Sequence, residues 1–197
     1  MPRRIREIDE GHLRGTNRRE SRLFFCSVKD LSLQNINKTA PYHVEAASKE
    51  GFFEFFTVHG VHYSIGFMDD NHTLLQSQDA YQLIIANVNH RKSPSDIKVR
   101  DTILQIVDEF FAVNNSTLLY ICETGDNKQA MRSRLFEQWF STYRRKGYYT
   151  MITSSIIDAD GQLNFATIIL RNDNPRLVQV IEEFTSTVQL LSQKPQD

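Results

Sequence analysis

The chain has 197 residues, of which 40% are hydrophobic and 11% aromatic, enough for a packed core in one domain. Its 23 basic and 24 acidic side chains leave a net charge of −1. This balance excludes a chain-wide electrostatic drive toward nucleic acid or an anionic membrane, so such binding would need a local patch.

Residues 1–22 differ from the rest of the chain, because they hold seven arginines against four acids and few apolar residues. We expect an arginine-rich N-terminal arm over 1–22 and a single α+β domain over 23–197. An arm of this composition is a candidate for nucleic-acid binding, although the interspersed acids weaken that interpretation.

The start of the chain, MPRRIREIDEGHLRG, has no apolar core of the kind that a secretory signal carries. No apolar run approaches the roughly 20 residues of a membrane helix. Cys26 and Cys122 lie in apolar runs and are expected to be reduced thiols, with a disulfide between them as the alternative. Together these features predict a cytoplasmic protein without a membrane segment.

The first half of the domain carries short runs rich in aromatic and β-branched residues, which indicate strands. The run at 52–59 is partly apolar on both faces, as in a strand that is covered on both sides. A polar loop is expected at 69–79. A first strand is predicted at 23–28. An antiparallel meander is predicted to follow, with strands at 42–47, 52–59, 61–68 and 80–88.

A helix is predicted next, with Ser93 as its cap, Pro94 at its first position and Asp96 at the capping-box spacing. It should end near Asn114–Asn115. The run 116–123 is almost continuously apolar, which predicts a central strand covered on both faces.

The segment DNKQAMRSRLFEQWFSTYRRKG (126–147) predicts a second helix, capped by Asp126 and Gln129 and stopped by Gly147. A hairpin is predicted at 148–158 and 162–171, followed by a helix that begins at Asn174–Pro175. The fold class is therefore α+β: an antiparallel-rich mixed sheet in the order meander, helix, strand, helix, hairpin, helix, with the helices packed on the sheet.

Arg132 falls inside the apolar arc of the second helix, at about 100° per residue. The arc comprises Met131, Leu135, Trp139, Tyr143, Phe136 and Phe140. A buried charge needs acceptors, so Arg132 either pairs with an acid (Glu123, Asp108 or Glu109), extends its head into water, or binds an anion. The candidate anion site comprises Arg132, Asn127, Arg100 and Lys98. The six histidines are scattered, and no metal site is expected.

Three stretches resemble a family of small uncharacterised bacterial proteins, described as a domain of unknown function. They are VRDTILQIVDEFF, LLYICETGDNKQAMRSRLFEQWF and ATIILRNDNP. The resemblance covers about residues 42–185 and implies a class without an activity.

The order of elements is also similar to the core of the GNAT acetyltransferases. The passage NKQAMRSRLFEQWFSTYRRKGYY resembles the helix-to-strand passage of that superfamily, with Asn127 and Phe136 at matching positions and Gly147–Tyr148 at its end. The resemblance implies acetyl-CoA as cofactor, held on a glycine-rich loop. The corresponding loop here, NHRKSPSDIKVRDT, has no glycine and supplies Arg91, Lys92, Lys98 and Arg100 instead.

No catalytic motif is recognisable, so the sequence predicts a non-catalytic binding or interaction domain without a cofactor. Its expected partner is a protein or a small anionic ligand. The first alternative is a divergent GNAT-like, acyl-CoA-dependent acyltransferase. The second is nucleic-acid binding through the basic arm.

Overall fold

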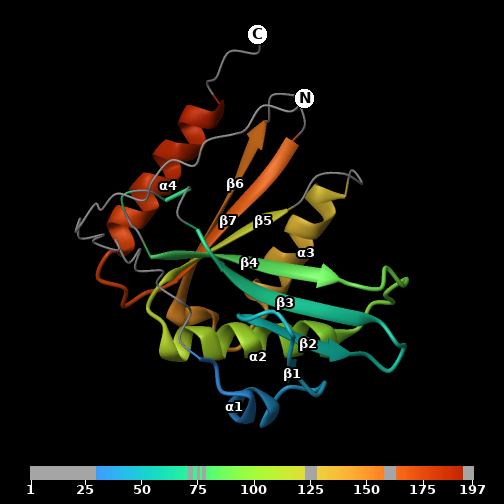
Figure 1. Cartoon of the computed structure of the whole chain (residues 1–197). Coiled ribbons are helices and arrows are strands. Elements are labelled where there is room, and N and C mark those ends of the chain that lie inside the picture. Colours follow the sequence, from blue (N-terminus) through green and yellow to red (C-terminus); the bar gives the residue numbers. More distant parts are fainter. Residues whose placement is uncertain are drawn as a thin grey trace, which may run out of the picture.

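The computed structural model describes residues 30–70, 73, 74, 76, 79–122, 128–157 and 163–192. Its helices and strands follow one another as shown in Figure 1. In chain order they are α1 (Leu33–Asn37), β1 (Glu45–Ala46), β2 (Phe52–Phe56), β3 (His62–Asp69), β4 (Ala80–Asn87), α2 (Ile97–Val113), β5 (Thr117–Cys122), α3 (Gln129–Ser141), the 3-10 turn η1 (Lys146–Tyr148), β6 (Tyr149–Ile157), β7 (Leu163–Arg171) and α4 (Leu177–Ser192).

All seven strands form one sheet in the order β1-β2-β3-β4-β5-β7-β6. Neighbouring strands are antiparallel except β4 and β5, which run parallel. That parallel pair covers only three register positions, Ala80–Gln82 against Thr117–Leu119, and Figure 1 shows the two strands parting toward their carboxyl ends. The predicted α+β class with a mixed, mostly antiparallel sheet is confirmed.

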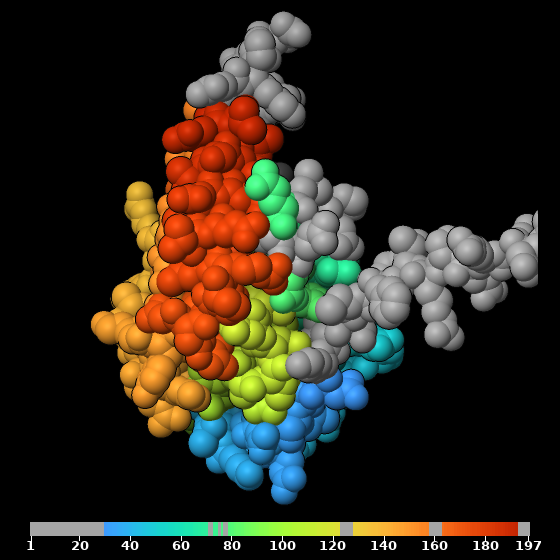
Figure 2. Space-filling model, turned by 90° about the vertical axis from the view of Figure 1, so that its left-hand side faces the viewer, coloured from blue at the N-terminus to red at the C-terminus, as the bar shows by residue number. Residues whose placement is uncertain are grey.

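Each face of the sheet carries its own apolar core, because successive side chains of a strand point to opposite faces. Leu118 packs into the core formed with α1, α2 and α3, whereas Leu119 packs into the core beneath α4. Figure 2 shows α4 lying over one side of the molecule. The prediction that the strand at 116–123 is central and covered on both faces is therefore confirmed.

The helix α2 starts later than the sequence predicted. Asp96, not Ser93, is the cap: its extended backbone precedes the helix and its carboxylate accepts the Lys98 N–H at 2.9 Å. The Ser93 hydroxyl accepts a hydrogen bond from the Tyr63 hydroxyl instead, at 2.7 Å. The C-terminal boundary was right, since Asn114 ends the helix.

The helix α3 is shorter than predicted at both ends. It begins after Lys128, which makes no side-chain cap, and the predicted cap Asp126 lies outside the described residues. It ends at Ser141 rather than Gly147, because the Thr142 hydroxyl donates to the Gln138 and Trp139 carbonyls at 2.9 and 3.1 Å. Gly147 lies in η1.

The buried face of α3 is also rotated from the predicted arc. Phe136, Phe140 and Tyr143 are buried as expected, but Met131 is 58% and Leu135 is 43% exposed. Ser133 and Gln129 take their places on the buried side. The face that packs on β5 and β7 is therefore centred closer to Phe140 than to Leu135.

The remaining differences concern ends and a short helix. β1 has only two residues, β2 stops at Phe56, and α4 begins at Leu177 after a turn in which the Asn174 side chain accepts the Arg176 N–H at 2.8 Å. Helix α1 was not predicted. The predicted strand 23–28 and the arm 1–22 lie outside the described residues. Within the described ranges, none of the helices is long and apolar enough to cross a membrane.

Candidate binding site

A buried carboxylate on α2 organises the segment that joins α3 to β6. Asp108 is 7% exposed and accepts hydrogen bonds from three side chains of that segment. The Tyr143 hydroxyl donates to Oδ2, the Tyr149 hydroxyl donates to Oδ1 at 2.9 Å, and the Arg145 Nη1 donates to Oδ2 at 3.1 Å. These bonds tie the middle of the chain to the start of the C-terminal hairpin.

The environment fixes the protonation states of this cluster. Burial, and then the hydrogen bond to Asp108, raise the pKa of Tyr143. Burial, and then the Asp108 charge, raise the pKa of Tyr149. The Asp108 charge also raises the pKa of Arg145. Near neutral pH, both tyrosines are therefore neutral donors and Arg145 is a cation.

A cavity of about 370 Å³ opens beside this cluster, between α2, η1 and the end of β7. Phe111 and Tyr149 form part of its wall, and Arg145, Tyr148 and Arg171 line it with two cations and an aromatic ring. The Arg171 guanidinium is held by Asp173 through Nε at 2.7 Å and Nη2 at 2.5 Å, and Nη1 donates to the Phe111 carbonyl at 3.1 Å. Arg171 is thus a fixed part of the wall.

Arg145 makes fewer hydrogen bonds to described residues than Arg171 does, so more of its N–H donors remain for a ligand. Asp108 takes one hydrogen bond from its Nη1, and no other described residue accepts a hydrogen bond from its side chain. The Tyr148 ring lies 5.6 Å from its guanidinium carbon and is 67% exposed. The cavity therefore presents a positioned cation and an exposed aromatic ring side by side.

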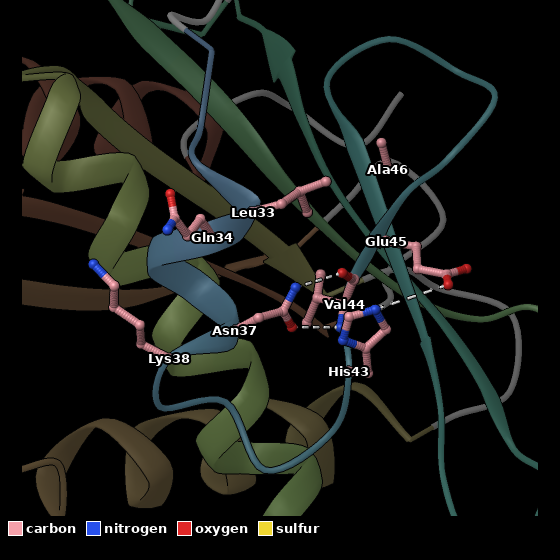
Figure 3. A pocket seen from close by; sticks show the side chains of 8 residues that line it. All are labelled: Leu33, Gln34, Asn37, Lys38, His43, Val44, Glu45 and Ala46. Atoms are coloured by element: carbon pink, nitrogen blue, oxygen red, sulfur yellow. Dashed lines mark hydrogen bonds and ion pairs between the residues drawn. The ribbon is translucent and has the colours of Figure 1, made fainter.

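A second hollow, of about 440 Å³, lies between α1 and β1 (Figure 3). Its polar centre is already satisfied: the Asn37 amide donates to the Val44 carbonyl and accepts the Val44 N–H, both at 2.8 Å. His43 and Glu45 lie 3.9 Å apart beside them. Since its central amide is engaged with the backbone, this hollow is the weaker candidate for a ligand.

The structure separates the residues of the predicted anion site. Lys98 and Arg100 lie in the first turn of α2, where the Arg100 Nε donates to Asp101 at 2.8 Å and Nη1 donates to Thr142 at 3.4 Å. Arg132 lies in the first turn of α3, ten residues from Thr142, or about 15 Å along the helix. Arg100 and Arg132 therefore do not converge on one small anion. Asn127 lies outside the described residues.

Arg132 is half-buried, close enough to Cys122 for its charge to act on the thiol. Burial raises the pKa of Cys122, and the Arg132 charge partly opposes that rise. Two of the acids expected to pair with Arg132 bond elsewhere: Asp108 as above, and Glu109 to the Ser32 N–H and the Asn35 amide at 3.2 and 3.1 Å. The role of Arg132 as an anion ligand stays a prediction.

Sequence reasoning missed the Asp108 cluster, although it named Asp108 as a candidate partner for Arg132. The available signal was an acid at helical spacing among buried apolar residues, Leu104, Asp108 and Phe111. The partners were not visible, because they follow α3 by a turn whose path the sequence did not give. No group of three or more His, Cys, Asp or Glu side chains that could hold a metal gathers within the described part of the chain.

The helix and strands that carry this cluster lie in the segment that has relatives. Residues 95–186 match DUF6169, a family of unknown function. The predicted resemblance to such a family is confirmed over this range, which runs from the start of α2 into α4 and is narrower than the expected 42–185. No curated protein and no solved structure matches the chain. The similarity to the GNAT acetyltransferases stays a prediction.

Proposed function

We propose that this domain is a non-catalytic binding domain that takes a small anionic ligand with a planar group in the cavity beside Arg145. The observation that supports it is the pairing of a positioned guanidinium with an exposed ring. Asp108 holds Arg145 through Nη1, and Tyr148 lies 5.6 Å from its guanidinium carbon. A guanidinium fork binds carboxylate or phosphate, and an aromatic face takes a planar group.

The chemistry around the cavity favours binding over catalysis. Tyr143 and Tyr149 have raised pKa values and donate to Asp108, so neither is poised as a general base near neutral pH. Asp108 accepts three hydrogen bonds, which leaves its carboxylate engaged in holding side chains. These groups support positioning of a ligand and do not supply an activated nucleophile.

Titration calorimetry with benzoate and acetate tests the proposal. Both probes carry a carboxylate for Arg145, but only benzoate has a ring that packs on Tyr148. We expect benzoate to bind several-fold more tightly than acetate, as an aromatic contact of about 0.5–1.5 kcal/mol would give. The absence of saturable heat with both probes at millimolar concentration would contradict the proposal.

Matched variants assign the contacts. Arg145→Gln should remove the binding of both probes, whereas Arg144→Gln, an exposed neighbour, should leave it intact. Tyr148→Ala should bring benzoate down to the affinity of acetate. Unchanged benzoate affinity in Arg145→Gln would place the anion elsewhere, with Arg132 as the next position to test.

A second candidate, a divergent GNAT-like acyltransferase, is favoured by the topology. The strand order carries one parallel pair, and β4 and β5 part after three register positions. In open α/β sheets, ligands bind outside the carboxyl ends of parallel strands, and this pair offers the corresponding position. Calorimetry with acetyl-CoA checks this candidate, and the glycine-free loop 89–102 is its weak point. No heat at millimolar acetyl-CoA would sink it.

A further inference from the structure

The two edges of the sheet are built very differently. β6 is one edge strand, with nine residues from Tyr149 to Ile157, and its inner side pairs with β7 along its whole length. No described strand pairs with its outer side. The sequence of β6, YTMITSSII, contains no charged residue, no proline and no glycine. It therefore lacks every common sequence device that keeps an edge from pairing with another strand.

The opposite edge has such devices. β1 has only two residues, one of them Glu45. Beside it, the Asn37 amide occupies both the N–H and the carbonyl of Val44, as a neighbouring strand would (Figure 3). A short, charged edge whose backbone groups are taken by a side chain is closed to a new strand. Among the described residues, the contrast marks β6 as the edge that is available for association.

We infer that β6 pairs with β6 of a second copy of this chain, antiparallel and centred on Thr153, to give one continuous sheet across a two-fold axis. This is the register in which all nine residues pair. Met151 then lies opposite Ser155 of the second copy, and Ile152 lies opposite Ser154. In these central pairs a large side chain meets a small one on each face, and at the ends of the strand Tyr149 lies opposite Ile157. The same pairs recur on both sides of the axis, as an isologous interface requires.

Charge favours a copy over other occupants. Because β6 has no charged residue, its own copy brings no like-charge repulsion, and a charged peptide gains no salt bridge along the strand. The side chains fit the same arrangement. Tyr149 and Met151 pack on the core under α2, and Ile152 and Ile156 pack on the core under α4. Pairing with a copy extends both cores across the axis.

The size of the contact sets the expected strength. Nine residues at about 3.3 Å per residue make a strip about 30 Å long. With the thickness of the sheet and one helix layer, about 20 Å, the strip buries roughly 1,200 Å² in total, the lower limit of specific interfaces. We therefore expect a dimer that dissociates on dilution.

The mass of the full chain in solution tests the inference. Light scattering or sedimentation should show a mass that rises from 22.9 kDa toward twice that value as concentration increases. Ser155→Lys, at an exposed position of β6, should weaken dimerisation at least tenfold, because it puts a charge on the pairing edge. Ala46→Lys, on the closed β1 edge, should leave it unchanged. A monomer at all concentrations would overturn the inference, as would equal effects of the two lysines.

A crosslink tests the register. With Cys26→Ser as background, Thr153→Cys places two thiols opposite each other at the axis, where Cα atoms of paired residues lie about 4.5–5.5 Å apart, within disulfide range. Mild oxidation should give a covalent dimer. Ser155→Cys should not crosslink to itself, since it lies opposite Met151 of the copy. A second protein, in which Thr153→Cys is made with Cys26 retained, tests the alternative. A disulfide between position 153 and Cys26 within one chain would show that the predicted strand 23–28 covers the edge, and the inference would be wrong.

Discussion

At the scale of single residues, Tyr143 is the most deeply buried of the three side chains that donate to Asp108. It is 8% exposed and donates to Oδ2 of a carboxylate that is itself 7% exposed. Tyr143→Phe removes that donor and leaves a buried acceptor short of a partner, which should lower the free energy of unfolding by about 1–3 kcal/mol. Urea denaturation at pH 7 measures the change. Tyr148→Phe, at a ring that is 67% exposed, should leave it unaltered.

The same hydroxyl predicts an alkaline limit to stability. Because the pKa of Tyr143 is raised in the folded protein, the unfolded chain releases this proton first, at about pH 10. The stability due to the neutral hydroxyl is therefore complete below about pH 10 and is lost as pH rises toward the folded pKa. The wild-type protein should lose stability more steeply above pH 10 than Tyr143→Phe does. Parallel pH profiles of the two proteins would contradict this assignment.

At the scale of elements, the helix α2 is capped by Asp96 and not by Ser93, which the sequence predicted. Asp96 accepts the Lys98 N–H at 2.9 Å and the Tyr42 hydroxyl at 2.5 Å. Asp96→Ala should cost about 1 kcal/mol at pH 7, whereas Ser93→Ala should change stability by only a few tenths of that. Thermal unfolding of the two variants distinguishes the caps, and a larger loss for Ser93→Ala would restore the sequence-based assignment.

The Asp96 cap should also respond to acid. The hydrogen bond from Tyr42 lowers the pKa of Asp96 below its usual value. A lowered folded pKa means that the contribution of the carboxylate is present above the unfolded value of about 3.9 and is lost as pH falls through the folded pKa. The difference in stability between wild type and Asp96→Ala should therefore shrink below about pH 4. A difference that stays constant down to pH 2 would show that the charge of Asp96 does not contribute.

Local patterns predicted the elements better than their ends. The strands at 61–68, 80–88, 116–123 and the C-terminal hairpin were placed within a few residues, because apolar runs and turn residues are local signals. The end of α3 was wrong because a threonine hydroxyl, not a glycine, takes its last carbonyls. The Asp108 site was missed because its partners meet only after that early end turns the chain into η1. Such a contact depends on tertiary structure and has no local pattern.

At the scale of the whole molecule, the sheet has a narrow seam between its two halves. β4 and β5 share only three register positions, so few backbone hydrogen bonds join strands β1–β4 to strands β5–β7. Helix α2 crosses this seam with two adjacent rings. The Phe110 ring stacks on Phe67 at 4.6 Å between centroids, whereas the Phe111 ring lies 5.0 Å from that of Tyr149 on β6. The two halves are therefore expected to unfold as one unit through α2.

Hydrogen exchange tests whether α2 makes the two halves cooperative. Phe110 is fully buried, so Phe110→Ala should lower the free energy of unfolding by about 3–5 kcal/mol. The sheet rings that Phe110 contacts, Phe67 and Tyr81, both lie in the first half. If the halves unfold together, the slowest amides of β3 and of β7 should nevertheless lose protection by the same factor. Met131→Ala, at an exposed position of α3, serves as the control and should leave both strands protected. A loss confined to β3 would mean that the seam separates two independently unfolding halves, and that the parallel pair, not α2, sets the limit of cooperativity.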